Sequence, residues 1–341
     1  MTLKPCVNLR TLGSQTTGVQ RYLLGLLPHL PPELSSITPS RALQGIKGHL
    51  WEQLYLPTQL KRRLLWSRGN TGPLGVIQVL TVHDAAALDH PEWFERKFAL
   101  WYSALLPRLI HKVRAIITVS QFSKERIVQL TGVETDRIQV ISNEVDRRFQ
   151  PIDRQTIQET IANLGLTEPY ILFVGSLEPR KNLKMLLETW QLGNFDGATL
   201  AVAGATGQVF QRFQIESIPK GVRLLGRVED DLLPALYSGA AGFVYGYIDE
   251  GFGLPPLEAL ASGCRVAVSD IPPHRAVCEQ TALYFDPFSP EDLLRKIEEL
   301  LRLDSARRAS MAEQGFRRAA LFSWETTAAQ TWRILEQEAN R

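Results

Sequence analysis

The sequence predicts an α/β protein made of two doubly wound domains. Short β-branched runs alternate with helical periodicity along the whole chain, and the strand runs are almost continuously apolar. Strands of that kind are buried on both faces, as in parallel sheets covered by helices. A chain of 341 residues is also too long for one ordinary domain and fits two of about 150–190 residues.

The expected elements fall into two sets with a polar stretch, 146–168, between them. This stretch is the expected hinge, so the predicted domains cover residues 1–148 and 149–324. Ligands are expected at the carboxyl ends of the strands. Strands are expected at 6–9, 76–82, 115–119, 138–142, 170–175, 199–203, 222–225, 242–245, 265–268 and 283–285, and helices at 18–29, 92–112, 121–131, 182–191, 230–239, 255–262, 291–303 and 304–320.

Composition excludes several classes of protein. With 44% apolar and 22% charged residues, the chain is not expected to be disordered. No apolar signal-peptide region opens the sequence, and no run of about 18 apolar residues predicts a membrane span. Three cysteines without a C-x-x-C pair argue against a disulfide framework and a zinc site. A cytoplasmic location is expected, either free or peripheral at the inner face of the membrane.

Charge is distributed unevenly. Residues 1–150 carry 19 Lys/Arg and 11 Asp/Glu, a net +8, and the remainder carries 19 and 25, a net −6. Either the first half faces an anionic partner, or these are two unrelated solvated surfaces. Aromatic and basic residues mix at 51–66 and 93–114, which fits helices in an anionic membrane interface as well as ordinary core helices. No stacking or groove-reading motif indicates nucleic-acid binding.

The segment after the strand at 170–175 carries the first chemical motif. Gly175 ends the strand, Arg180 and Lys181 follow, and Asn182 is placed to cap the next helix. Backbone N–H groups, a helix start and two cations together suit a diphosphate. The alternative is a solvated Arg-Lys pair in a loop.

The second motif lies between the strand at 242–245 and the helix after it. Glu250 stands in the loop, Glu258 is expected in the first turn of the helix, and the turn 251–253 exposes backbone N–H groups between them. Two carboxylates beside bare backbone suit the vicinal hydroxyls of a sugar. The alternative is that Glu258 only complements the helix dipole and Glu250 is solvated.

These motifs resemble the family 4 retaining glycosyltransferases, which have the GT-B fold. EGFGLPPLEALASG is similar to that family's E-x7-E signature, and VGSLEPRKNL resembles its donor-diphosphate loop. TGVQRYLLGLL and TVHDAAALDHPEWF resemble its acceptor-domain segments, the latter carrying the active-site His83 and Asp84; TVSQFSKERIV and ISNEVDRRF resemble later ones. FSWETTAAQTW resembles the terminal helix, which implies that residues 325–341 cross back onto the first domain.

The resemblance implies two Rossmann-like domains facing across a cleft, with the nucleotide sugar on the second and the acceptor on the first. Arg180 and Lys181 neutralise the leaving diphosphate. Glu250 contacts the transferred sugar, Glu258 binds the ribose and His83 reaches the sugar from the opposite wall. Further expected contacts are Gly175 and Ser176 in the phosphate loop, Gly251, Phe252, Gly253 and Leu254 beside the sugar, Arg227 and Val228 near the base, and Gly18, Arg21 and Asp84 on the acceptor side.

Some positions depart from the family pattern. Ser176 stands where an arginine is frequent, Ala276 where a glutamate is frequent, and Glu144 where a glycine is usual. Gly18 and Arg21 fit a plain helix start as well as a ligand contact. His90, His111 and His274 are interpreted as structural or surface residues. The two acids and the lysine are all present.

The expected activity is metal-independent, retaining transfer of a hexose to a saccharide or lipid-linked acceptor. No D-x-D occurs, so the cations take the place of a divalent ion. The donor is a GDP- or UDP-sugar, and the LEPRKN form of the loop resembles bacterial mannosyltransferases, which points first to GDP-mannose. Two alternatives stay open: a nucleotide-sugar epimerase, and a catalytically silent sugar-binding or assembly protein.

Overall fold

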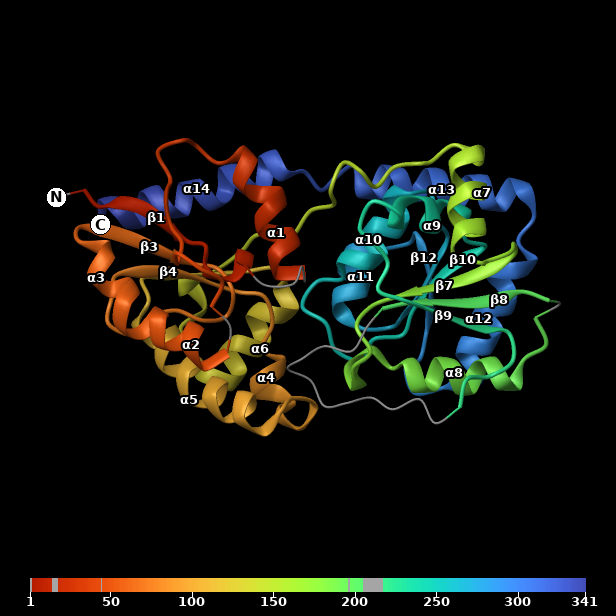
Figure 1. The fold of residues 1–341 in the computed structure, drawn as a ribbon, viewed down its shortest axis with the longest axis horizontal. Helices are drawn as coiled ribbons and strands as arrows, with labels where there is room; N and C mark the ends of the chain where they lie inside the picture. Colours follow the sequence, from red (N-terminus) through yellow and green to blue (C-terminus); the bar gives the residue numbers. More distant parts are fainter. Residues whose placement is uncertain (1, 14–17, 44, 196, 205–216) are drawn as a thin grey trace. The chain divides into compact units, whose positions relative to one another are not determined.

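The computed structural model describes residues 2–13, 18–43, 45–195, 197–204 and 217–341. It contains two compact units, each with a six-stranded parallel sheet (Figure 1). The first unit comprises residues 1–92, 96–144 and 323–341, and the second comprises 93–95 and 145–322. The chain therefore leaves the first unit after 144, four residues before the predicted boundary, and returns to it at 323.

The first unit has the strand order β2-β1-β3-β4-β5-β6. Its central strands β3 and β4 are almost wholly buried. The strands are β1 (Lys4–Asn8), β2 (Ser35–Ile37), β3 (Arg63–Ser67), β4 (Gln78–Val82), β5 (Ala115–Thr118) and β6 (Ile138–Val140); the α-helices are α1 (Gly18–Leu26), α2 (Gly45–Leu50), α3 (Leu56–Leu60), α4 (Ala86–Asp89), α5 (Arg96–Lys112), α6 (Gln121–Thr131) and α14 (Trp324–Asn340).

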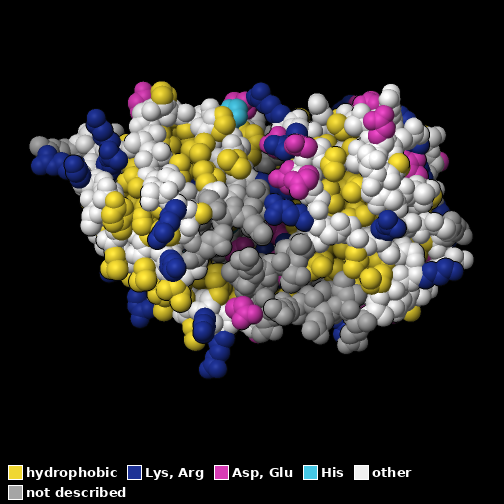
Figure 2. All heavy atoms as spheres, in the orientation of Figure 1, with side chains coloured by type: hydrophobic (Ala, Val, Ile, Leu, Met, Phe, Trp, Pro, Cys, Tyr) yellow, Lys and Arg dark blue, Asp and Glu magenta, His cyan; other side chains and the backbone are white. Residues whose placement is uncertain are grey.

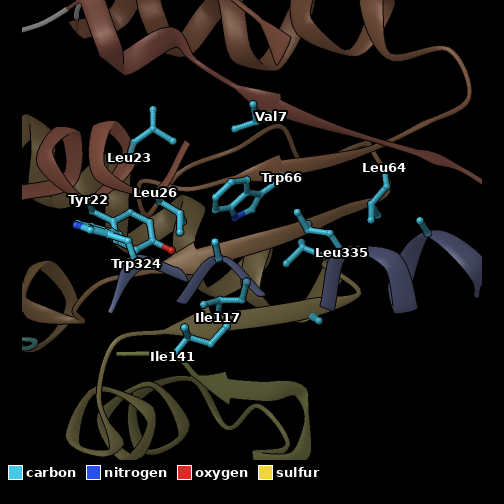
Figure 3. Packing of buried hydrophobic residues seen from close by; sticks show 14 residues of the cluster. Val7, Tyr22, Leu23, Leu26, Leu64, Trp66, Ile117, Ile141, Trp324 and Leu335 are labelled. Atoms are coloured by element: carbon cyan, nitrogen blue, oxygen red, sulfur yellow. The ribbon is translucent and has the colours of Figure 1, made fainter. Parts of the chain in front are cut away.

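The core of the first unit is completed by its last helix, α14. Trp324 and Leu335 of α14 are buried among side chains of α1 and the sheet (Figure 3). Gly25 of α1 makes this packing possible, because a Cβ there would lie only 2.2 Å from the Trp324 ring. The buried Trp66 of β3 donates its indole N–H to Thr81 Oγ1 at 2.9 Å, so its polar group is satisfied.

The second unit has the strand order β12-β11-β10-β7-β8-β9. After β7 and β8 the backbones touch: a Cβ on Gly204 would lie 1.8 Å from Gly175 O. The strands are β7 (Tyr170–Val174), β8 (Thr199–Ala203), β9 (Val222–Gly226), β10 (Gly242–Tyr245), β11 (Val266–Ser269) and β12 (Ala282–Phe285); the α-helices are α7 (Arg154–Asn163), α8 (Leu183–Leu192), α9 (Leu233–Gly239), α10 (Leu254–Ala261), α11 (Pro272–Cys278), α12 (Pro290–Arg302) and α13 (Ser305–Ala319).

The structure corrects the sequence prediction in two regions. The mixed aromatic and basic residues of 51–66 fit a helix, but the strand β3 begins at Arg63. β3 lies between β1 and β4 in the sheet and pairs with both. The expected hinge 146–168 contains α7, a helix of 10 residues whose first turn is capped by Asp153. β3 depends on pairing partners far away in sequence, which outweigh the local pattern, whereas α7 begins at a local cap.

Two details at helix starts also differ from expectation. Asn182 precedes α8 at φ 56°, but its side chain donates to Pro287 O at 2.7 Å and does not cap the helix. Glu258 is the fifth residue of α10 and so lies in its second turn, beyond the predicted first turn.

Three further observations concern properties expected from composition. Cys6, Cys264 and Cys278 are buried and form no disulfide. No helix among the described residues has both the length and the apolar composition needed to cross a bilayer. In the same residues, no three His, Cys, Asp or Glu side chains are grouped as a metal site.

Candidate active site

Two loops of the second unit meet because β7 and β10 are neighbours in its sheet. After β7 the chain forms the short 3-10 turn η6 (Pro179–Lys181), and after β10 it runs through residues 246–253 to α10. Ile248 N donates to Arg180 O at 3.0 Å and joins the two loops. The predicted diphosphate loop and the predicted sugar loop therefore share one edge of the sheet.

A closed ring of four charges occupies this junction. Glu178 Oε1 lies 3.0 Å from Arg180 Nε and 3.4 Å from Lys181 Nζ. Glu250 Oε2 lies 3.2 Å from Lys181 Nζ and 3.9 Å from Arg180 Nη1. Glu178 and Lys181 are buried. Because two carboxylates balance two cations, the ring is neutral, as a buried ionic group must be to avoid a large desolvation cost.

The protonation states in this ring follow from its contacts. Burial lowers the pKa of Lys181 and Arg180 lowers it further, while Glu250 and Glu178 oppose the shift. Burial alone would raise the pKa of Glu250, but Lys181 and Arg180 outweigh it and hold the pKa at about 2. Glu250 is therefore ionised at neutral pH and can only accept hydrogen bonds.

Two tyrosines form the floor of the site. The rings of Tyr245 and Tyr247 stack with centroids 3.6 Å apart, and Lys181 Nζ lies 3.6 Å from the Tyr247 ring centroid. Tyr245 donates its hydroxyl to Glu250 Oε2 at 3.0 Å. Gly175 leaves room for this floor, because a Cβ there would be 2.0 Å from the Tyr247 hydroxyl. A cation over an aromatic face is attracted to it, so the floor helps to hold Lys181.

His274 of α11 lies beside this floor and is fully buried. Ser269 donates its hydroxyl to Tyr247 O, so His274 Nδ1 must be the donor in its contacts with Ser269 O at 2.9 Å and Ser269 Oγ at 3.0 Å. Burial lowers the His274 pKa to about 4, so the ring is neutral. Its Nε2 then carries no proton and can only accept a hydrogen bond; it is buried and has no hydrogen-bond partner in the described structure.

The glycine turn before α10 leads to the second predicted acid. Gly253 has φ 103°, in the region that favours glycine. The Phe252 ring packs edge-on against the Phe322 ring, so the Phe252 side chain points into the second unit. Glu258 is buried and accepts a hydrogen bond from the Tyr237 hydroxyl at 3.2 Å. Leu254 is half-buried at the start of the helix. Glu258 therefore contacts α9, whereas Glu250 contacts the two cations.

Other predicted contacts of the second unit lie along the same edge. Ser176 follows Gly175 and is half-buried. Arg227 and Val228 follow β9, the edge strand, and β8 lies between that strand and β7. Arg227 is exposed, and its predicted role near the base stays a prediction.

The predicted residues of the first unit gather where β4 ends and α1 begins. His83 follows β4, donates from Nε2 to Arg68 O at 2.9 Å and meets the Tyr22 ring edge-on at 5.0 Å. Burial lowers the His83 pKa. Asp84 accepts from Ala86 N at 3.3 Å, at the start of α4. Gly18 is the first residue of α1, and Arg21 is half-buried on the same helix; their acceptor-side role stays a prediction.

Two family models match the chain. The one described as Glycosyl transferases group 1 matches residues 155–318, and Glycosyltransferase Family 4 matches residues 59–149. The chain belongs to the family 4 glycosyltransferases. This glycosyltransferase is 29% identical to O-antigen chain mannosyltransferase B of Escherichia coli, over 85% of this chain and 74% of the relative. It is also 29% identical to O-antigen chain mannosyltransferase RfbU of Salmonella typhimurium, over 82% and 77%.

Solved structures with the same fold cover nearly the whole glycosyltransferase. HepE from Anabaena, crystallised with UDP and glucose, has a TM-score of 0.76 at 16% identity and covers 98% of this chain and 99% of its own. WaaG, a glycosyltransferase involved in lipopolysaccharide biosynthesis, has a TM-score of 0.72 at 15% identity, covering 97% and 99%. The glycosyltransferase has the GT-B fold, as the sequence predicted.

Several residues at the site of this glycosyltransferase were not predicted. Glu178 binds both cations, Tyr245 and Tyr247 form the floor, and His274 was interpreted as structural or surface. The sequence did contain one signal for the tyrosines: Tyr245 and Tyr247 are two residues apart at the end of an apolar strand, a spacing that puts both side chains on one face. Nothing in the sequence pattern distinguishes Glu178 or His274 from a solvated loop residue.

Proposed function

We propose that this glycosyltransferase transfers mannose from GDP-mannose to a saccharide or lipid-linked saccharide acceptor, with retention of the anomeric configuration and without a metal ion. The observation that carries the proposal is the placement of Arg180 and Lys181, two cations fixed by carboxylates at the carboxyl edge of the second sheet. The mannosyltransferase names of the two relatives support the choice of sugar. The absence of a D-x-D motif supports metal independence.

In this proposal each charged group has a role. A bound diphosphate replaces Glu250 as the partner of Lys181 and Arg180, since it carries more negative charge than one carboxylate. Glu250 is then available to accept hydrogen bonds from sugar hydroxyls, while buried Glu178 keeps both cations in place. As the bond between sugar and diphosphate breaks, charge grows on the leaving group and the fixed cations stabilise it.

The test is a transfer assay with GDP-mannose and UDP-glucose, each with a defined saccharide acceptor and with acceptor omitted. We expect a glycosylated product from GDP-mannose whose anomeric proton, seen by NMR, shows the donor's configuration. A new nucleotide sugar formed without acceptor would identify an epimerase. Donor binding without any turnover would identify a sugar-binding protein.

A peripheral contact with an anionic membrane belongs to the same proposal. On the first unit, Ile46, Leu50 and Leu54 are more than half exposed, and the partly exposed Trp101 of α5 lies against His49 with ring centroids 5.2 Å apart. Figure 2 shows apolar and basic side chains intermixed on the visible face of this unit. Residues 1–150 carry net charge +8, which complements anionic lipid.

Vesicle co-sedimentation tests this contact. We expect binding to vesicles with anionic lipid at low salt, loss of binding at high salt, and no binding to neutral vesicles. The variant Leu50→Ser with Leu54→Ser removes apolar surface and should weaken binding, whereas Leu192→Ser on the second unit, also exposed, should not. Absence of binding at low salt would return the charge asymmetry to two unrelated surfaces.

A further inference from the structure

A buried arginine stands at the carboxyl edge of the first sheet, outside every predicted contact. Arg68 directly follows the central strand β3 and is 2% exposed. Asn8 ends the neighbouring strand β1, and His83 follows β4 on the other side. In parallel sheets this edge is where ligands bind. Arg68 therefore has the position of a ligand-binding residue.

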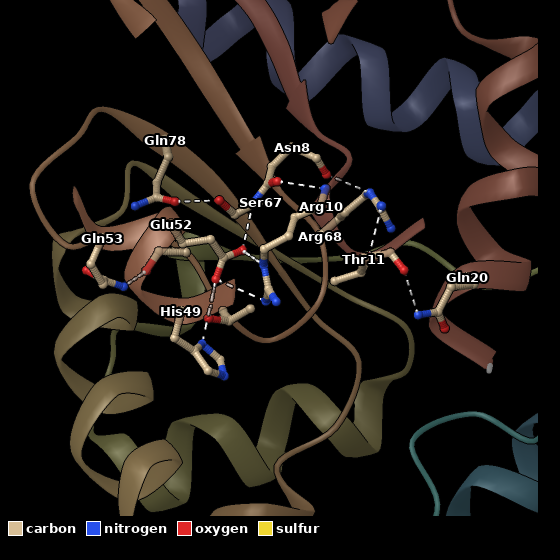
Figure 4. Close-up of polar contacts among 12 residues, drawn as sticks. Asn8, Arg10, Thr11, Gln20, His49, Glu52, Gln53, Ser67, Arg68 and Gln78 are labelled. Atoms are coloured by element: carbon tan, nitrogen blue, oxygen red, sulfur yellow. Dashed lines mark hydrogen bonds and ion pairs between the residues drawn. The ribbon is translucent and has the colours of Figure 1, made fainter. Parts of the chain in front are cut away.

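The contacts of Arg68 leave its charge without a carboxylate partner. Its Nε donates to Asn8 O at 3.0 Å and its Nη2 to Thr11 Oγ1 at 3.0 Å, and both acceptors are neutral (Figure 4). Its Nη1 is buried and has no hydrogen-bond partner in the described structure. Within the described residues, no carboxylate lies in ion-pair range of Arg68.

The carboxylate of Glu52, which belongs to the same network, is already paired with another arginine. Glu52, fully buried in the helical turn Trp51–Tyr55, pairs with Arg10: its Oε2 accepts a hydrogen bond from Arg10 Nη2 at 3.2 Å, and its Oε1 lies in ion-pair range of Arg10 Nε at 3.0 Å. It also accepts a hydrogen bond from Asn8 Nδ2 at 2.8 Å (Figure 4). A further hydrogen bond comes from Thr71 Oγ1 at 3.1 Å. Glu52 and Arg10 balance each other. Arg10, Glu52 and Arg68 together therefore carry one surplus positive charge, and Glu52 opposes the lowering of the Arg68 pKa without neutralising both arginines.

A surplus buried charge is costly, and an anion is its natural complement. His49 does not change the balance, since burial lowers its pKa and keeps the ring neutral at pH 7. Burial also lowers the pKa of Arg68, to about 9, which still leaves it charged at neutral pH. An arginine offers a planar fork that matches the oxygens of phosphate or carboxylate.

We propose that Arg68 binds an oxyanion of the acceptor, so that the natural acceptor is a saccharide carrying a phosphate or carboxylate group. The assignment to the acceptor rests on the proposed transferase function, whereas the anion site itself does not. Because Nη1 is shielded from water in this structure, the anion displaces Thr11 from the guanidinium as it enters. The same arginine orients His83: its carbonyl oxygen accepts a hydrogen bond from Nε2–H, which leaves Nδ1 as the acceptor nitrogen of the neutral ring.

The binding test uses inorganic phosphate and mannose 1-phosphate as probes, by calorimetry, on protein saturated with GDP. Saturation occupies Lys181 and Arg180, so only a second anion site responds. We expect the wild type to bind the probes and Arg68→Gln to bind them about tenfold more weakly or worse, as for loss of a charge-assisted hydrogen bond. Lys181→Ala should retain this binding.

A matched control is Arg63→Gln, at the other end of the same strand and exposed to solvent. It should bind the probes like the wild type. Arg68→Lys keeps the charge without the fork and should recover only part of the affinity. If Arg68→Gln fails to unfold cooperatively, the comparison of Arg68→Lys with the wild type decides. Equal affinity of those two proteins, or no phosphate binding by the GDP-saturated wild type, overturns the site.

A second arm identifies the source of the anion. Transfer to a phosphorylated acceptor should have a lower KM than transfer to the matching neutral acceptor, and Arg68→Gln should abolish that difference. If Arg68→Gln weakens GDP binding and leaves both acceptors equal to the wild type, the anion belongs to the donor and the acceptor assignment is wrong. Phosphate binding that depends on Arg68, in a protein that transfers no sugar, would refute the proposed function and keep the anion site.

Discussion

The hydroxyl oxygen of Thr327 lies 2.8 Å from Glu144 Oε1 and 3.0 Å from Ser142 O. One hydroxyl has one proton and can donate to only one of these acceptors. Both contacts are satisfied if the Glu144 carboxyl is protonated and donates to Thr327, which then donates to Ser142. Burial raises the pKa of Glu144 to about 8, in agreement with this arrangement. Glu144 lies where the chain leaves the first unit, and Thr327 lies just after it returns.

This pair predicts a pH dependence of stability. The pKa of Glu144 is about 8 in the folded protein against an ordinary value of 4.5, so between these values the folded state holds a proton that the unfolded state has lost. The contribution of Glu144 to the free energy of unfolding is therefore full below about pH 4.5 and declines as the pH rises to 8. Glu144→Gln keeps a neutral donor and does not titrate. Its melting temperature relative to the wild type should rise from pH 5 to pH 8.5, and parallel curves would contradict a buried neutral carboxyl.

Lys181→Ala should lower kcat by about 10²-fold or more with a smaller change in donor KM, because the lysine stabilises charge that develops as the diphosphate leaves. Lys181→Arg should recover only part of the rate. The control is Lys184→Ala on α8, whose side chain is 77% exposed and pairs with Glu188; it should stay within about twofold of the wild type. Single-turnover rates at saturating donor measure the effect. Near-normal transfer by Lys181→Ala would eliminate the proposed diphosphate site.

The two glutamates should differ in their effect on nucleotide binding. Glu250 pairs with Lys181 in the unliganded protein, so Glu250→Gln should bind GDP at least as tightly as the wild type while lowering kcat. Glu258→Gln should weaken GDP binding as well as turnover if Glu258 binds the ribose. Calorimetry with GDP separates them, with melting temperatures as the check on folding. Equal losses of GDP affinity in both variants would refute the assigned roles.

The aromatic floor should contribute to catalysis through its ring. Tyr247→Leu removes the face beneath Lys181, and the loss of a cation–π contact worth about 0.5–2 kcal/mol corresponds to about 2- to 30-fold in rate. Tyr247→Phe keeps the ring and loses the hydroxyl contacts with Val174 O and Tyr245, so its kcat should stay closer to the wild type than that of Tyr247→Leu. Steady-state kinetics of the two variants decide. Equal kcat values would show that the ring does not hold Lys181.

Turnover should be unchanged by EDTA, because in the proposed mechanism Lys181 and Arg180 neutralise the diphosphate leaving group in place of a divalent ion. The assay compares rates after chelation with rates after addition of Mg²⁺ or Mn²⁺. A strong loss that either ion restores would show that the cations alone are insufficient.

Local signals made some elements predictable to the residue. α6 was predicted at 121–131 and is found there, because Ser120 caps its first turn and Gly132 ends it in the left-handed region. By contrast, β3 was missed. It lies at the end of the stretch 51–66, whose mixed aromatic and basic residues fit a helix, and it becomes a strand by pairing with β1 and β4. That pairing joins residues far apart in sequence, so the local sequence pattern does not predict it.

The same distinction separates the predicted from the missed parts of the site. Lys181 and Glu250 belong to short motifs that can be recognised from the sequence alone. Their salt bridge spans 69 residues and depends on β10 lying beside β7. Glu178 and His274 join the site only through that strand order. The surplus charge of Arg68 was equally invisible, since it depends on which arginine Glu52 binds.

The division of the first unit into separate stretches of chain has a consequence for synthesis on the ribosome. The second unit is almost wholly one continuous stretch, 145–322, so its core is complete before α14 emerges. The core of the first unit is incomplete until α14 has been synthesised, because Trp324 and Leu335 are part of that core. Until then α1 and the sheet expose an apolar surface of the kind that chaperones bind and that aggregates. Although its strands are translated first, the first unit therefore cannot complete its core until α14 is available.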